Sequence, residues 1–366
     1  MTIIGGSFAS VGLILTYWTT SIEYSYISYG VFVGIGAGLA FPCTIYIVTS
    51  YFKKLRGLTN GMCLSGSCVG AVILPPCFRI LLENFGFRGT CLALGIMMCS
   101  VVLAAYFYDP VEKHMKRVKV KKPETKPVQN GMQDLNGEEM TIILNQNNEI
   151  RRKSVKEEKT GFNKYLDLSL LKNPVYLIIL FSNCANSIGC TNYTILLPSY
   201  AESLGFSKNL AAYLLSIESV FDFIGRIAGS TLSDFNLIPK RWFFIVGSAI
   251  SGIALAIVPF VNSSFALFAI LCSIFGLATG TYIGITAIVM TDYLGDETLT
   301  SSYGISMFAN GILQLIGPPI CSALYEKLGA YQPIFLGLGL CIIFGSLLWS
   351  LMPIALRKTK SKQAAA

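Results

Sequence analysis

The chain has 366 residues, of which 53% are hydrophobic and only 13% are charged, and its mean hydropathy is +0.59. Soluble domains carry about 25% charged residues, so this composition excludes an ordinary soluble protein and predicts an integral membrane protein. The formal net charge of +8 is typical of basic loops gathered on one side of a membrane, and we expect no nucleic-acid partner.

Apolar runs of 18 or more residues recur along the sequence and predict ten membrane-spanning helices. This pattern predicts an all-α polytopic membrane protein. In chain order the predicted helices cover about residues 2–20, 25–50, 58–83, 87–108, 174–201, 208–232, 240–261, 264–292, 299–325 and 331–353.

The predicted helices fall into two unequal groups. Residues 1–108 form an N-terminal half-bundle of four helices, and residues 174–353 form a C-terminal bundle of six. Between them, residues 109–173 are polar and basic, and we expect this loop to be largely disordered because it cannot bury enough apolar area. Residues 354–366 are a basic tail. Because transporters are commonly built from six-helix halves, the simplest account is a 6 + 6 architecture without its first two helices; a genuine ten-helix fold is the alternative.

The lysines and arginines predict the orientation in the membrane. Loops on one side hold 23 of the 28, including fourteen in the central loop. The positive-inside rule then places both termini and the central loop in the cytoplasm.

Residues 210–234 carry three charges within one predicted membrane helix: Glu218, Asp222 and Arg226. A charge at the centre of such a helix costs about 2.5–3.5 kcal/mol on insertion scales, so it is kept where it faces protein or a water-filled path. Steps of four residues place the three charges within about 80° of one helical face. We interpret that face as the functional site.

The arginine and the aspartate make chemical sense as a binding pair. Arg226 stays charged and can bind a carboxylate in two-point fashion, so we expect it to bind substrate together with Asp222. Asp222 can neutralise Arg226 in the empty site and take up a proton when a substrate carboxylate replaces it. A permanent structural ion pair is the alternative. Glu218 is either a second proton acceptor or a water-exposed group near the outer end of the helix.

The stretch YFKKLRGLTNGMCLSGSCVG (51–70) resembles the second signature of the monocarboxylate transporter family, a branch of the major facilitator superfamily. The family pattern has an aromatic pair, basic residues and spaced glycines, and four other positions of this stretch depart from it. The matching residues are Tyr51, Phe52, Lys54, Arg56, Leu58, Gly61 and Gly66.

This resemblance implies transport of small carboxylates or related organic anions, in some members with protons, at the plasma membrane. It implies an Asp-x-x-x-Arg pair on the family's eighth helix, which Asp222 and Arg226 match. A single-span ancillary glycoprotein accompanies some family members. On this alignment residues 1–20 correspond to the family's third helix, so the lysine of the first helix is absent from this chain.

The segment GRIAGSTLSD followed by PKR (225–241) resembles the superfamily's gating motif. An acidic helix end opposite basic residues predicts a cytoplasmic latch, and anchoring of the basic residues at the membrane surface is the alternative. The predicted gating residues are Gly229, Asp234, Lys240 and Arg241, with Lys54 and Arg56 in the other half.

Two functional hypotheses follow. The first is a secondary active or facilitative transporter of small carboxylates that works by alternating access. The second is a transport-incompetent truncated fragment or regulatory isoform of such a transporter. No nucleophile–base set, metal-ligand cluster or phosphate-binding loop occurs in the sequence, so we expect neither an enzyme nor a cofactor.

Overall fold

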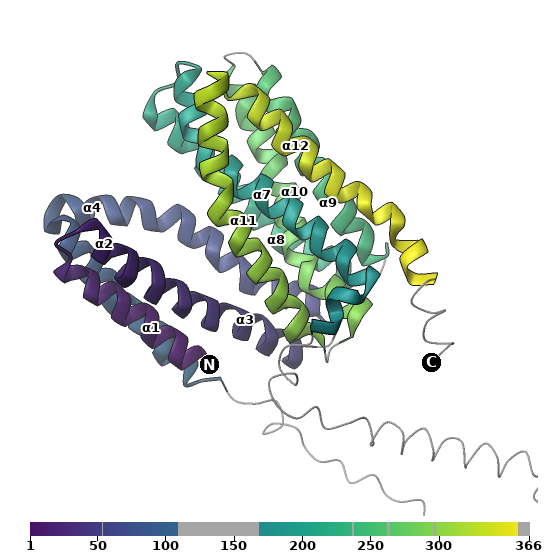
Figure 1. The fold of residues 1–366 in the computed structure, drawn as a ribbon, viewed down its shortest axis with the longest axis horizontal. Helices are drawn as coiled ribbons and strands as arrows, with labels where there is room; N and C mark the ends of the chain where they lie inside the picture. Colours follow the sequence, from purple (N-terminus) through teal and green to yellow (C-terminus); the bar gives the residue numbers. More distant parts are fainter. Residues whose placement is uncertain (53, 109–167, 236–237, 262–263, 296–297, 358–366) are drawn as a thin grey trace, which may run out of the picture. The chain divides into compact units, whose positions relative to one another are not determined.

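The computed structural model describes residues 1–52, 54–108, 168–235, 238–261, 264–295 and 298–357 (Figure 1). Every regular element within these ranges is helical, which confirms the predicted all-α class. Predictions for the central loop at 109–167 and for the end of the tail at 358–366 lie outside the described residues. The helices are α1 (Thr2–Leu15), α2 (Ile22–Ser25), α3 (Gly34–Tyr51), α4 (Arg56–Ala105), α7 (Pro174–Ser203), α8 (Lys208–Asp234), α9 (Lys240–Ile257), α10 (Phe265–Leu294), α11 (Leu299–Leu328) and α12 (Gln332–Leu347).

Short segments with tighter or wider helical turns extend several of these helices. A π-helical segment joins α2 to α3, and 3-10 turns follow α1, α9 and α12 or precede α7. Their bounds are Tyr26–Val33 for the π-helical segment, and Thr16–Trp18, Leu168–Lys172, Val258–Phe260 and Leu348–Leu351 for the 3-10 turns.

The helices agree with the ten predicted spans. Within the described residues, seven helical segments are long and apolar enough to cross a membrane by length and composition. One of them, α4, contains two predicted spans, because Gly86 (φ 65°, ψ −176°) interrupts its 50 residues with a conformation that L side chains rarely adopt. Two further predicted spans are not among these seven segments. The apolar segment Thr2–Trp18 is shorter than they are, and α8 carries the three central charges.

In the first group of helices, α1 packs against α3 and α4 through small residues (purple to blue in Figure 1). A Cβ atom on Gly5 would lie 2.6 Å from the carbonyl oxygen of Gly36 on α3. Ser10 of α1 donates a 2.8 Å hydrogen bond to the carbonyl of Gly95 on α4. Lipid provides no hydrophobic drive between helices, so close backbone packing and buried hydrogen bonds hold these helices together.

The helices from α7 onward enclose an aromatic core. The rings of Tyr193 and Phe275 lie 4.2 Å apart between centroids, and those of Tyr200 and Phe335 lie 4.8 Å apart. All four side chains are at most 1% exposed. Burial of large rings fixes α7, α10 and α12 against one another, and this rigid group supports the face of α10 on which α8 lies.

Candidate functional site

The candidate site lies on α8, which packs against both α4 and α10 (Figure 1). The hydroxyl of Ser207 caps the start of α8 by accepting from the N–H of Leu210 at 3.4 Å. The helix runs unbroken for 27 residues, so the three charges at its centre are presented from a continuous backbone.

Asp222 and Arg226 form the two-point pair that their spacing predicts. The Nε atom of Arg226 donates to Oδ1 of Asp222 at 3.0 Å, and Nη2 donates to Oδ2 at 2.7 Å. The two side chains are 11% and 16% exposed for the arginine and the aspartate respectively. A fork-to-carboxylate contact of this kind is stronger and more directional than a single charged hydrogen bond.

The other side of the Arg226 guanidinium binds α4. Its Nη1 atom donates to the backbone carbonyl of Leu64 and to the hydroxyl of Ser67, both at 2.7 Å. The thiol of Cys68 donates to Oδ2 of Asp222 at 3.1 Å. Sequence reasoning missed these α4 residues. The only signal in the sequence was the run of small and polar residues in the second half of the stretch 51–70, and this run contains no charged residue.

Glycines of α10 allow α8 to approach closely. A Cβ atom on Gly276 would collide with the backbone oxygen of Glu218, and one on Gly280 would collide with that of Asp222. A Cβ atom on Gly284 would collide with the side-chain hydroxyl of Ser230 and lie 3.0 Å from the backbone oxygen of Arg226. The four-residue spacing of these glycines makes a flat strip along α10, and this strip places the charged turns of α8 against backbone rather than side chains.

Glu218 has a different hydrogen-bond partner from the other two charges. One carboxylate oxygen accepts a 3.3 Å hydrogen bond from the hydroxyl of Thr194 on α7. The second, Oε2, is buried and has no hydrogen-bond partner among the described residues. The charges on α8 thus face different neighbours: Glu218 contacts α7, whereas Asp222 and Arg226 contact α4.

The end of α8 contacts the start of α4. The carboxylate of Asp234 accepts hydrogen bonds from the backbone N–H groups of Gly57 and Leu58, both at 2.9 Å. A Cβ atom on Gly57 would collide with the backbone oxygen of Ser230. One helix therefore carries both a carboxylate that caps another helix and, about two to three turns earlier, the Asp222–Arg226 pair.

Further contacts join α4 to α8 and α10. The amide Nδ2 of Asn60 donates to the carbonyl of Gly284 on α10 at 2.8 Å. A Cβ atom on Gly61 would collide with the backbone oxygen of Arg226, so this signature glycine allows α4 to lie directly against the charged part of α8. Signature residue Gly66 has open space around it.

The remaining predicted gating residues lie near the same helix ends. Lys240, the first residue of α9, pairs with Asp292 of α10 at 3.3 Å between Nζ and Oδ2. Arg241 follows it and is exposed. Gly229 lies against the side chain of Thr281. Lys240, one of the basic residues predicted to lie opposite Asp234, thus forms its ion pair between α9 and α10. Asp234 binds the backbone N–H groups at the start of α4.

The signature residues before Leu58 occupy the connection between two helices. Tyr51 ends α3, Phe52 is 51% exposed, and Lys54 precedes Arg56 at the start of α4. This connection leads directly into Gly57 and Leu58, whose N–H groups bind Asp234.

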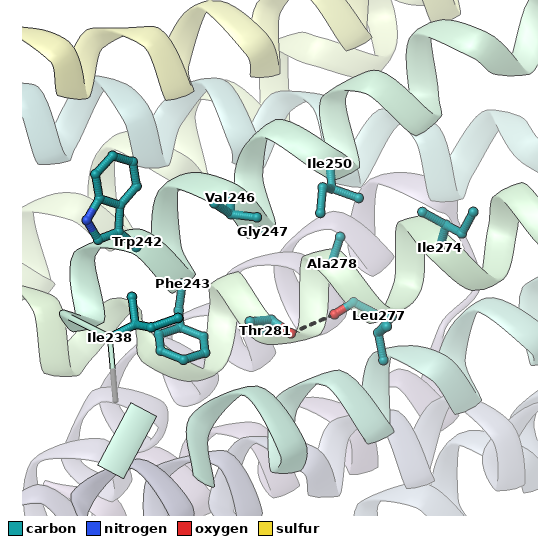
Figure 2. A pocket seen from close by; sticks show the side chains of 10 residues that line it. All are labelled: Ile238, Trp242, Phe243, Val246, Gly247, Ile250, Ile274, Leu277, Ala278 and Thr281. Atoms are coloured by element: carbon teal, nitrogen blue, oxygen red, sulfur yellow. Dashed lines mark hydrogen bonds between the residues drawn. The ribbon is translucent and has the colours of Figure 1, made fainter. Parts of the chain in front are cut away.

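A groove of about 370 Å³ lies over α10 beside α9, and Figure 2 shows its lining. Its walls are apolar, and Thr281, its one hydroxyl, bonds back to the carbonyl of Leu277 at 2.9 Å. A carboxylate would find no charged partner there, so this groove suits hydrocarbon and not an anion. The lining residues are Ile238, Trp242, Phe243, Val246, Gly247, Ile250, Ile274, Leu277, Ala278 and Thr281.

Comparisons with known proteins give one consistent family. The Major Facilitator Superfamily model matches residues 1–235 and 179–366. Monocarboxylate transporter 12 of Xenopus laevis is 28% identical over 99% of this chain and 75% of its own length. Its Homo sapiens counterpart is 29% identical over 98% of this chain and 68% of its own length. Monocarboxylate transporter 9 of Gallus gallus is 28% identical over 94% of this chain and 78% of its own length.

Two solved structures share the fold. The E. coli fucose:proton symporter FucP superposes with a TM-score of 0.63 at 15% identity, covering 96% of this chain and 83% of FucP. The proton:xylose symporter XylE superposes with a TM-score of 0.67 at 14% identity, covering 96% of this chain and 79% of XylE. At these identities the likeness shows the fold alone.

The family match extends over both groups of helices, and the similar proteins are transporters and not enzymes. The resemblance seen at residues 51–70 is confirmed by relatives that match nearly the whole chain. This multi-pass membrane protein belongs to the major facilitator superfamily, and monocarboxylate transporters are among its relatives.

Proposed function

We propose that this protein carries small monocarboxylates or related organic anions across the plasma membrane by alternating access, with Arg226 as the residue that binds the carboxylate. The buried two-point pair between Arg226 and Asp222 carries this proposal. Arg226 already holds a carboxylate in the geometry that a substrate carboxylate would need. The names of the relatives support the substrate class.

Charge balance supports coupling of the anion to a proton. The empty site holds one negative and one positive group, Asp222 and Arg226, and is neutral. If a monocarboxylate replaces Asp222 on Arg226, the site acquires an extra negative charge in a poorly solvated place. Uptake of one proton by the Asp222 carboxylate restores neutrality, because Arg226 stays charged. The transported unit is then one anion with one proton.

The two groups of helices serve as the moving halves in this proposal, residues 1–108 and residues 174–353. Both termini lie in the cytoplasm, as the distribution of lysine and arginine indicates. The hydrogen bond from Gly57 to Asp234 then closes the cytoplasmic end. In this proposal Lys54, Arg56 and Arg241 lie at the cytoplasmic membrane surface. A state open to the cytoplasm requires this contact to break.

Uptake of radiolabelled lactate and pyruvate into proteoliposomes tests the proposal. Arg226→Ala is expected to abolish uptake of both acids, because it removes the group that holds the carboxylate. Arg79→Ala is the matched control, since Arg79 pairs with Glu83 on α4 at 79% and 63% side-chain exposure, far from α8 in sequence. Unchanged uptake by Arg226→Ala would reject the site, and absence of uptake by the wild-type protein would reject the substrate class.

A further inference from the structure

The α4 residues that contact the ion pair take no direct part in the proposed exchange of carboxylates on Arg226. Four of the five N–H donors of Arg226 are used, two by Asp222 and two by α4. When a carboxylate displaces Asp222, the Nη1 contacts to Leu64 and Ser67 can stay in place. These contacts keep the planar guanidinium from turning, so its Nε–Nη2 edge remains aimed at the incoming anion.

The displaced carboxyl group of Asp222 also needs a partner. Cys68 is 3% exposed, and its thiol already lies 3.1 Å from Oδ2 of Asp222. A thiol donates weakly to a carboxylate and accepts weakly from a protonated carboxyl group. Cys68 can therefore keep one contact to Asp222 before and after the proton arrives.

We propose that Cys68 is a positioning residue of the carboxylate site, which holds the Asp222 carboxyl group in both protonation states while Leu64 and Ser67 hold Arg226. The inference rests on the proposed function and adds α4 to the site, so that both groups of helices build it. The lack of a side chain at Gly61 allows α4 to approach α8 in this way, since a Cβ atom there would collide with the backbone oxygen of Arg226.

The charged and titratable groups around Asp222 come from three helices. On the α10 side, the backbone of Gly280 faces Asp222, because a Cβ atom on this glycine would collide with the backbone oxygen of Asp222. Replacing the thiol therefore changes one neighbour of the carboxyl group and leaves the others in place. The groups are Arg226 and Glu218 on α8, Cys68 on α4, and Cys190 on α7, which lies close enough for an electrostatic interaction with Asp222.

The first measurement tests the contact without any substrate. Alkylation of this buried thiol by N-ethylmaleimide requires that the thiol leave its neighbours, and the hydrogen bond to the Asp222 carboxylate opposes that release. An amide oxygen accepts a weaker hydrogen bond than a carboxylate, so in the purified full chain Asp222→Asn is expected to raise the alkylation rate of Cys68 at least about fivefold, measured by peptide mass spectrometry. Cys63, on the same helix, serves as the internal control in each sample. An unchanged ratio of the Cys68 rate to the Cys63 rate would overturn the contact.

The second measurement tests the role in transport, through the pH profile of pyruvate uptake into proteoliposomes. Cys68→Ala is expected to raise KM by about threefold to tenfold and to flatten its pH dependence. Cys68→Ser, which keeps a donor and an acceptor, restores the wild-type profile, and Cys63→Ala retains it. A wild-type pH profile in Cys68→Ala, together with lost uptake in Arg226→Ala, rejects this inference and keeps the proposed function. Full uptake by Arg226→Ala rejects the proposed function itself.

Discussion

Asp234 accepts a 2.9 Å hydrogen bond from the backbone N–H of Gly57, a residue 177 positions earlier in the chain. The partner of this carboxylate is thus the N-terminus of a helix, where unpaired N–H groups and the helix dipole attract negative charge. The same carboxylate binds the next N–H, of Leu58. A side chain at the end of α8 therefore caps α4, and the cap ties the first group of helices to the second.

The first prediction concerns this cap. Asp234→Ala leaves two helix N–H groups of α4 without their acceptor, which costs about 1–2 kcal/mol. We expect the contact between α4 and α8 to open more often, and a cysteine placed at Leu58 to be alkylated faster. Asp292→Asn breaks the ion pair between Lys240 of α9 and Asp292 of α10, so it should leave the alkylation rate at position 58 unchanged. Equal effects of the two variants would contradict a cap that joins the two groups of helices.

The second prediction concerns the charge of Asp222. Asp222→Asn leaves the Arg226 guanidinium without a neutralising carboxylate, and removing one member of a buried pair costs about 3–5 kcal/mol. The two side chains are 11% and 16% exposed, so the pair is mostly buried and its loss should cost slightly less than a fully buried pair would. We expect a lower melting temperature of the purified protein and loss of the stimulation of uptake by an inward proton gradient.

Arg226→Lys provides the comparison for that variant. It keeps the positive charge and loses the planar fork, so the melting temperature should fall less than in Asp222→Asn while carboxylate uptake still drops. Gradient-stimulated uptake that survives in Asp222→Asn would show that the proton binds elsewhere.

The third prediction concerns the glycine strip of α10. Gly280→Val would place side-chain atoms against the backbone of Asp222 and the amide of Arg226. Backbone cannot move aside as a flexible side chain can. We therefore expect the free energy of unfolding to fall by about 1–3 kcal/mol or more, seen as a lower melting temperature in detergent. Gly311→Val on α11, where nothing lies within 4 Å, should change it little.

The fourth prediction concerns Glu218. Its buried Oε2 lacks a partner among the described residues, which suits a carboxyl group that carries a proton. Glu218→Gln, a neutral group of the same shape, is expected to keep the wild-type melting temperature and to lower the pH dependence of uptake. A fall of several degrees in that temperature would instead indicate a carboxylate that is ionised in the folded protein. Thr194→Val removes the hydroxyl bonded to Glu218 and checks whether this contact matters for folding.

The amino-acid sequence by itself determined the helices and the charged face of α8 that we propose as the site. Long apolar runs must be helical in a bilayer, because each backbone group has to find its partner within the same segment. Spacing of four residues is enough to bring Asp222 and Arg226 together, since one helix fixes the geometry of both. These relations are local, so the pattern of residues reveals them.

Only the tertiary structure decided which helix faces each charge. It placed Arg226 against Leu64 and Ser67, Asp234 on the N-terminus of α4, and Lys240 beside Asp292. Several of these partners are backbone N–H or carbonyl groups, which every residue possesses and which no sequence pattern distinguishes. Glycines at the contacts bring those groups within reach, and whether a glycine does so depends on the helix opposite it. The physical reason is that helical periodicity fixes a face, while the packing of helices chooses the neighbour of that face.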